Sequence, residues 1–437
     1  MRTLPLTTAL LAIAATASAQ DYTLHSFKKI QLTDKFWSEG ATFGDFNHDG
    51  KMDVAAGPYW YEGPDFTKRH EFYPANKTFT HKKADGTTEQ IEGFEGGLGV
   101  ENTYSDNFFM FAYDFNGDGW TDIMIYGFPG LDASWYENPK GREGHWQRHK
   151  VLDVVDNESP WFVDVNGDGK PDIVCNSGGY FGYATADWSN AAKPWTFHPI
   201  TPKGNWQRFT HGLGVGDVNG DGRMDILEQA GWWEQPASLA GDPVWTFHKT
   251  DFGTGGAQMW VYDVNGDGKN DVITSLAAHG YGLAWYEQVS ENGNIAFKEH
   301  IIVNKEKTEN RYGVAFGQLH AIDLIDMDGD GIKDIVTGKR FWAHGSHGDV
   351  DPGGAAVLYW FKIVRTPGGG VDFVPNLIDN NSGIGTQIIA GNINNAKYPD
   401  VVMGNKKGAF VFLHDTKKVS QAEWQAAQPK PLAPAGK

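Results

Sequence analysis

The segment Asp217-Val-Asn-Gly-Asp-Gly-Arg-Met-Asp225 carries the nine-residue pattern that decides the fold of this chain. It places carboxylate or amide oxygens at positions one, three, five and nine, and a glycine at position six. Oxygens at this spacing, with a backbone carbonyl at position seven and a sharp turn at the glycine, suit a hard cation such as Ca²⁺. The segment is therefore predicted to be a calcium-binding loop.

The same pattern recurs along the 437 residues, with successive copies starting 46 to 69 residues apart. A seventh, degenerate copy runs from Asn392 through Asn394 to Asp400; it lacks acids at positions one and five and is predicted to be empty. About six bound Ca²⁺ ions are expected. The predicted ligands are Asp45, Asn47, Asp49, Asp53, Asp114, Asn116, Asp118, Asp122, Asp164, Asn166, Asp168, Asp172, Asp217, Asn219, Asp221, Asp225, Asp263, Asn265, Asp267, Asp271, Asp326, Asp328, Asp330 and Asp334.

The spacing of the copies suits one four-stranded sheet per repeat, so we predict an all-β chain folded as a seven-bladed β-propeller. Each loop lies between two short apolar runs, such as 213–215 and 225–227, and should join the first two strands of a blade. Aromatic residues at 14% and 55 glycines agree with many short strands and tight turns. Long helices are not expected.

The last repeat supplies only two further strands, at 401–403 and 409–414. Its missing outer strand is predicted to come from Ser26–Ile30, whose sequence is similar to that of the fourth strand at 297–301. Closure by an N-terminal strand would remove the exposed edges of an open ring. The propeller is expected to span 20–416, followed by a tail rich in Lys, Ala and Pro at 417–437.

Residues 1–19 have the features of a signal peptide, with Arg2, an apolar run and a small-residue cleavage site at 17–19, which predicts a secreted or periplasmic protein. No later apolar run is long enough to span a membrane. Cys175 is the only cysteine, so packing and bound ions must hold the fold. A formal charge of −18 argues against nucleic acid as a partner.

With these loops the chain resembles the FG-GAP or VCBS-repeat propellers, a superfamily that includes the calcium-binding blades of integrin α chains. Gly216 before Asp217, and Phe43-Gly44 before Asp45, carry the resemblance beyond the loop itself. The resemblance implies the propeller fold and calcium. It does not imply one function, because the superfamily includes adhesion modules, carbohydrate lyases and exported proteins of other kinds.

The histidine-containing segments 211–212, 278–280 and 319–321 are similar to those in the propeller of fungal aldos-2-ulose dehydratases. That resemblance implies a metal-assisted sugar dehydratase. The additional domains of those enzymes are not recognisable in this chain.

A candidate site follows from the repeat itself, since the first strands of all blades line the central channel of a propeller. Six residues before each loop stand Glu39, Phe108, Glu158, His211, Ala257, His320 and Thr386, which should form a ring at the channel mouth opposite the calcium loops. Two His and two Glu suit one divalent transition metal, although a solvated polar mouth is the alternative. Segments leaving the second strands would add His279, Tyr281 and Arg340.

Two functions remain open. In one, the chain is a lyase or dehydratase in which a metal polarises the carbonyl of a sugar while a His or Glu removes the adjacent proton. Here His211 and His320 would be ligands, and Glu39 or Glu158 a ligand or the base. In the other, a calcium-stiffened ring presents its loops to a glycan or a protein, with no chemistry. The expected partner is a carbohydrate or small polar ligand in either case, with a protein as a further alternative in the second.

Overall fold

The computed structural model describes residues 22–98 and 103–433. The predicted signal peptide at 1–19 lies outside these residues. Nearly all regular structure is strand, and the described chain contains a single α-helix, α1 (Gln421–Ala427). No helix in the described part is long and apolar enough to cross a membrane. The prediction of an all-β fold is confirmed.

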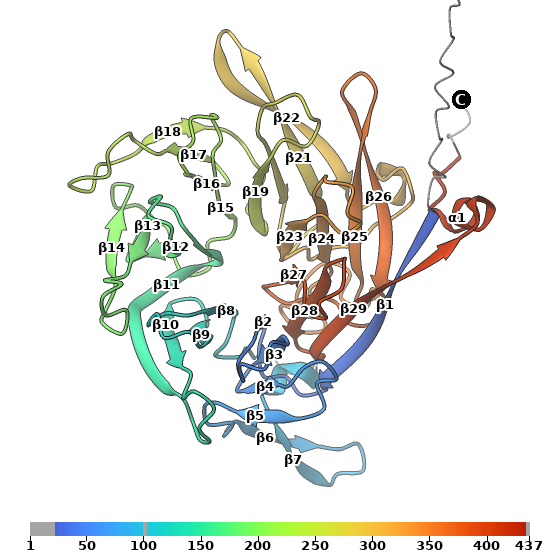
Figure 1. Cartoon of the computed structure of the whole chain (residues 1–437). Helices are drawn as coiled ribbons and strands as arrows, with labels where there is room; N and C mark the ends of the chain where they lie inside the picture. Colours follow the sequence, from blue (N-terminus) through green and yellow to red (C-terminus); the bar gives the residue numbers. More distant parts are fainter. Residues whose placement is uncertain (1–21, 99–102, 434–437) are drawn as a thin grey trace, which may run out of the picture.

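The strands of the first four repeats form antiparallel, four-stranded groups that follow one another around a common centre (Figure 1). A long strand, β11 (Gln147–Val163), belongs to two of them, because its first half pairs with β10 and its second half with β12. The groups are β2 (Thr42–Gly44), β3 (Asp53–Ala56), β4 (Tyr59–Tyr61) and β5 (Arg69–Glu71); β8 (Phe109–Tyr113), β9 (Asp122–Tyr126), β10 (Leu131–Glu137) and β11; β11, β12 (Asp172–Ser177), β13 (Tyr180–Thr185) and β14 (Thr196–Pro199); and β15 (Leu213–Gly216), β16 (Asp225–Glu228), β17 (Gly231–Glu234) and β18 (Thr246–Lys249).

The last three repeats continue the ring, so that the described residues contain seven four-stranded groups, or blades. Short additional elements lie between them: the hairpin β6–β7 and the 3₁₀ turns η1 (Glu95–Leu98) and η2 (Lys307–Glu309). The last groups are β19 (Gln258–Tyr262), β20 (Asp271–Ser275), β21 (Leu283–Glu291) and β22 (Asn294–Val303); β23 (Ile322–Ile325), β24 (Asp334–Gly338), β25 (Leu358–Thr366) and β26 (Gly370–Asp379); and β27 (Ile389–Gly391), β28 (Asp400–Asn405), β29 (Gly408–Val419) and β1 (Tyr22–Thr33).

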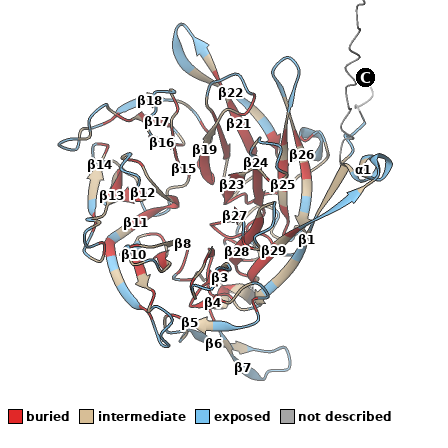
Figure 2. Cartoon of the chain, viewed as in Figure 1, coloured by how far each residue is buried: buried red, intermediate tan, exposed pale blue. Residues whose placement is uncertain are grey.

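The core is divided among the contacts between neighbouring blades. Seven clusters of buried apolar side chains occur in the described chain, and each joins two adjacent blades. One of them packs Val402 and Val411 of the last blade against Val54 and Tyr61 of the first. Figure 2 shows the buried residues concentrated within the blades and the exposed ones along the outer strands and loops. Cys175 is fully buried in one of these clusters as a free thiol.

A repeated side-chain set fixes the third and fourth strands of four blades. In the first, Trp60 stacks on His70 with ring centroids 4.0 Å apart, and Glu62 lies 2.6 Å from Nε2 of the same histidine. Aromatic stacking and a charge-assisted hydrogen bond together account for these residues without catalysis. The equivalent sets are Trp135, His149 and Glu137; Trp232, His248 and Glu234; and Trp285, His300 and Glu287.

The N-terminal strand closes the ring as predicted. Strand β1 pairs antiparallel with β29, with Phe27 opposite His414 and Ile30 opposite Val411. The pairing extends beyond the predicted Ser26–Ile30 segment, from Tyr22 opposite Val419 to Thr33 opposite Ala409. The expected tail at 417–437 therefore starts inside β29, and it then forms α1, whose Trp424 packs against Tyr22.

Two histidines face each other across this closure, which predicts a pH dependence of stability. Nδ1 of His25 lies 2.9 Å from Nε2 of His414, and burial lowers the pKa of each to about 4. An unfolded histidine titrates near 6.5, so the stability contribution is complete above that pH and is lost as the pH falls towards 4. Between pH 7 and pH 4.5 we expect the unfolding free energy of His25→Gln to fall by about 1 to 2 kcal/mol less than that of the parent. Thermal melts at the two pH values measure this, and an equal drop in melting temperature in parent and variant would contradict it.

Candidate metal centre

Four side chains from four different blades converge near the centre of the ring, at the ends of the inner strands opposite the acidic loops. Glu158 lies on β11, His211 precedes β15, His279 follows β20 and His320 precedes β23. One potential ligand atom from each lies within 4.8 Å of all the others. Nε2 of His211 is 3.0 Å from Nε2 of His279, and Oε2 of Glu158 is 3.5 Å from Nε2 of His211 and 3.1 Å from Nε2 of His320. The shared offset before the loops therefore does bring Glu158, His211 and His320 together.

The burial of these groups favours neutral imidazole. His320 is fully buried, and burial together with the charge of Arg340 lowers its pKa well below the usual value. Burial also lowers the pKa of His279. Neither ring nitrogen of His320 has a hydrogen-bond partner in the described chain, although Nε2 lies 3.1 Å from the carboxylate of Glu158. Unpaired buried nitrogens are costly unless something else occupies their lone pairs.

Arg340 connects this cluster to Glu39, which the ring prediction had included as a ligand or base. The guanidinium is 1% exposed and lies 3.3 Å from Oε1 of Glu39 and 3.5 Å from Oε2 of Glu158. Burial by itself would raise the pKa of Glu158, but His211 and His320 beside it hold that pKa well below its usual range. Glu39 is an ion-pair partner of Arg340 rather than a member of the histidine cluster. The expectation that all four ring residues would meet is wrong for Glu39.

A carboxylate that sequence reasoning missed lies beside the cluster. Oδ1 of Asp349 is 2.8 Å from Nδ1 of His344 and 3.6 Å from Nδ1 of His279. Asp349 therefore lies on the side of His279 opposite its Nε2 contact with His211, but it hydrogen-bonds to His344, and Nδ1 of His279 has no hydrogen-bond partner among the described residues. The sequence could have pointed to Asp349, because it follows His344 and His347 in one loop. The exposed His347 is not part of the cluster.

Lys406 was also missed. It lies 14 residues after the start of the seventh loop, as Arg340 lies 14 residues after the start of the sixth, so the position of Arg340 was the available indication. Its ammonium lies 4.7 Å from the ring centroid of Tyr104, and burial lowers its pKa to about 8. Tyr281, by contrast, lines a different cavity of about 390 Å³ with Leu276 and Tyr286. Its predicted place beside the cluster is not supported.

The acidic loops fold as compact turns around their own carboxylates. In the first, Oδ1 of Asp45 accepts the backbone N–H of Asp49, and its Oδ2 accepts that of Gly50. Five of the six fifth-position carboxylates form an ion pair with a lysine or arginine, for example Asp118 at 3.0 Å from Lys140. In the sixth loop, Lys362 contacts both Asp328 and Asp330. Among the described loop acids, only Asp326, Asp328 and Asp334 of the sixth loop offer ligand atoms that all lie within 4.8 Å of one another.

The ninth-position aspartates have a second role that sequence reasoning did not separate from ligation. Asp53 is fully buried, accepts the N–H of Phe46 on Oδ2 and the N–H of Gly63 on Oδ1, and so ties the loop to the end of the third strand. Asp400 makes the same contacts with Ile393 and His414 in the degenerate loop, where the other acids are missing. Burial, reinforced by the neighbouring carboxylates, raises the pKa of Asp122 to about 7 and that of Asp334 to about 8.

Comparison with known proteins identifies the repeats. The model of the FG-GAP-like repeat matches three stretches, at residues 114–175, 164–228 and 263–337. These stretches contain the second to sixth acidic loops.

Among solved structures, the Tc holotoxin pore of Photorhabdus luminescens is similar over 77% of this chain and 16% of its own, with 14% identity and a TM-score of 0.36. The V. cholerae biofilm matrix protein Bap1 is similar over 71% of this chain and 61% of its own, with 15% identity and a TM-score of 0.31. The chain thus spans less than two thirds of either protein. No curated protein matches the sequence significantly.

Proposed function

We propose that this propeller, three stretches of which match the FG-GAP-like repeat, is an exported, calcium-loaded lyase or dehydratase acting on a sugar at its channel mouth. In this proposal Glu158, His211, His279 and His320 would together hold one divalent transition metal. The observation that carries the proposal is the convergence of these four ligand atoms within 4.8 Å. Three imidazoles and one carboxylate are a donor set suited to zinc, iron or manganese.

The metal would polarise the carbonyl oxygen of a keto sugar and so acidify the adjacent C–H. His344 is the best-placed base, because Asp349 accepts from its Nδ1 and leaves Nε2 able to take a proton, and its ring centroid lies 4.3 Å from that of His279. Removal of the proton forms the C=C bond as the C–O bond on the next carbon breaks. The departing hydroxide takes up the proton that His344 removed and leaves as water, so that His344 returns to its neutral form. Arg340 is buried in ion pairs and positions Glu158.

Export rests on the signal-peptide pattern of residues 1–19, and calcium on the oxygens of six loops. The competing function is a binding module in which the calcium-stiffened ring presents its loops to a glycan or protein. That alternative needs no metal beyond calcium, so metal content distinguishes the two.

The test is elemental analysis of the purified protein together with a metal titration. We expect about one transition-metal ion per chain, and at least a tenfold loss of metal affinity in His211→Ala and His320→Ala. Calcium content should stay unchanged in both, since the acidic loops lie at the other ends of the inner strands. His248→Ala is a matched control, because it removes a histidine of the same blade as His211 that stacks on Trp232 instead. Equal transition-metal content in the parent, the variants and the control would favour the binding module.

A further inference from the structure

A second cavity lies between the first and second blades, away from the histidine cluster. Its volume is about 410 Å³, which is at the small end of ligand pockets. One wall comes from the segment around the hairpin of β6 (Thr78–Lys82) and β7 (Thr88–Glu92), an insertion that the four-stranded repeat does not require. The other wall is β10 and the start of β11. The insertion accounts for the largest spacing between acidic loops.

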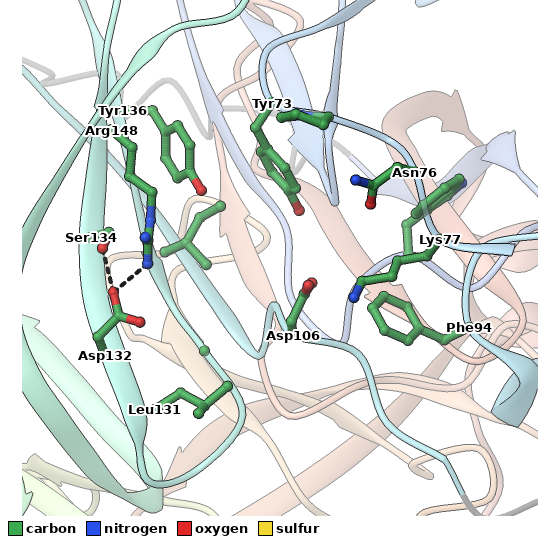
Figure 3. Close-up of a pocket in the computed structure, with 14 residues that line it drawn as sticks. Tyr73, Asn76, Lys77, Phe94, Asp106, Leu131, Asp132, Ser134, Tyr136 and Arg148 are labelled. Atoms are coloured by element: carbon green, nitrogen blue, oxygen red, sulfur yellow. Dashed lines mark hydrogen bonds and ion pairs between the residues drawn. The ribbon is translucent and has the colours of Figure 1, made fainter.

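Aromatic rings form part of the lining. Tyr73 and Tyr136 are stacked with ring centroids 5.2 Å apart, and their hydroxyl groups are directed into the cavity (Figure 3). Trp37 also lines it, is only 3% exposed, and its Nε1 has no hydrogen-bond partner in the described chain. Sugar rings pack their C–H faces on such aromatic surfaces while their hydroxyls need hydrogen-bond partners.

Charged groups of both signs complete the lining and balance one another. Asp132 accepts from Arg148 at 2.6 Å and from Ser134, while the carboxylate of Asp106 points toward the ammonium of Lys77 (Figure 3). Two acids and two bases give the cavity no formal charge. This composition offers both acceptors and donors, as a polyol requires, and lacks the excess of positive charge that a phosphate or carboxylate ligand would need.

We infer that this cavity binds one or two rings of a neutral saccharide. The inference goes beyond the proposed function, since it needs neither the metal nor the histidines. Trp37 and Asp106 each stand two residues before a ring position, Glu39 and Phe108, so these two lining residues lie near the same end of the inner strands as the histidine cluster. A saccharide held here would be a neighbour of the channel mouth without touching the metal ligands.

The test is calorimetric titration of the folded protein with neutral probes, namely the methyl glycosides of glucose, galactose and mannose and the disaccharide cellobiose, and with glucuronate as the charged comparison. At least one neutral probe should bind in the millimolar range or tighter, and more tightly than glucuronate. Tyr73→Ala and Asp106→Asn should each weaken that binding about tenfold. Asp106 is exposed, so its variant keeps the test valid even where Tyr73→Ala fails to fold.

Two controls locate the ligand. Asp153→Asn changes an exposed carboxylate of the same blade outside the cavity and should leave binding unchanged. His211→Ala should also leave it unchanged, whereas loss of binding in that variant would place the sugar at the channel mouth and overturn the inference. Failure of every neutral probe to bind, tighter binding of glucuronate, or unaltered binding by Asp106→Asn would overturn it as well.

Discussion

Removal of calcium should lower the melting temperature by about 20 °C. Six loops, each occupied at a hundred times its dissociation constant, would together contribute about 16 kcal/mol to the native state, because only the folded loops gather the ligands. Without the cation, carboxylates such as Asp45 and Asp49 face one another in a turn where Asp45 accepts the N–H of Asp49. Calorimetry with and without excess EDTA, followed by calcium addition, measures the effect. A melting transition unmoved by EDTA would show that the loops are not structural calcium sites.

Single-loop variants separate cation binding from turn formation. Asp217→Ala removes the first ligand of the fourth loop, whose Oδ1 and Oδ2 also accept the N–H groups of Asp221 and Gly222, and should lose one calcium per chain. Asn392→Ala, at the same position of the degenerate loop, is the matched control and should leave the calcium count unchanged. An equal loss in both variants would contradict the assignment of six occupied loops.

Deletion of strand β1 should have the second large effect. A variant that begins at Asp34 loses eleven residue pairs with β29 and leaves the edge of β29 without a partner. The lost backbone hydrogen bonds are worth on the order of 10 kcal/mol, comparable to the whole stability of an ordinary domain. We expect the variant to aggregate or to lose its cooperative transition, as monitored by circular dichroism and size-exclusion chromatography.

A truncation at the other end is the control for that deletion. Ending the chain after Gln428 removes residues beyond α1 and keeps every pair between β1 and β29. It also loses the hydrogen bond from the N–H of Leu432 to the carbonyl of Arg311, so its melting temperature should stay within about 2 °C of that of the parent. If the β1 deletion melted like this control, closure by the N-terminal strand would contribute little to stability.

The fold could be predicted because one local pattern carries both its chemistry and its spacing. Each copy marks the turn between two strands, so the positions of Asp45, Asp114 and Asp164 along the sequence indicate where successive blades begin. Closure by Ser26–Ile30 could be predicted because the sequence of the last repeat contains too few strands for a four-stranded blade, so the missing strand had to come from elsewhere in the chain. The same offset reasoning placed His211 and His320 at one height in the channel.

What could not be predicted depends on contacts between repeats. Glu39 stands at the same offset before its loop as His211 and His320. The long side chain of Arg340 reaches it from another blade and forms an ion pair with it, so Glu39 does not join the histidine cluster. Tyr281 is close in sequence to His279, yet the turn at 276–282 directs it into another cavity. The cavity between Tyr73 and Tyr136 depends on an insertion that no repeat period describes. The double role of Asp53 appears only once its buried hydrogen bonds are seen.

The pairing of β1 with β29 also sets an order of events during biosynthesis. The first described strand to leave the ribosome finds its partner only when 408–419 has been made, so nearly the whole chain separates the two halves of one sheet. At 5 to 20 residues per second this is an interval of about 20 to 80 s. During that time the alternating side chains of β1 offer an unpaired edge, and contacts so distant in sequence form slowly. A chaperone that covers residues 22–33 until release would therefore act on the step that completes the ring.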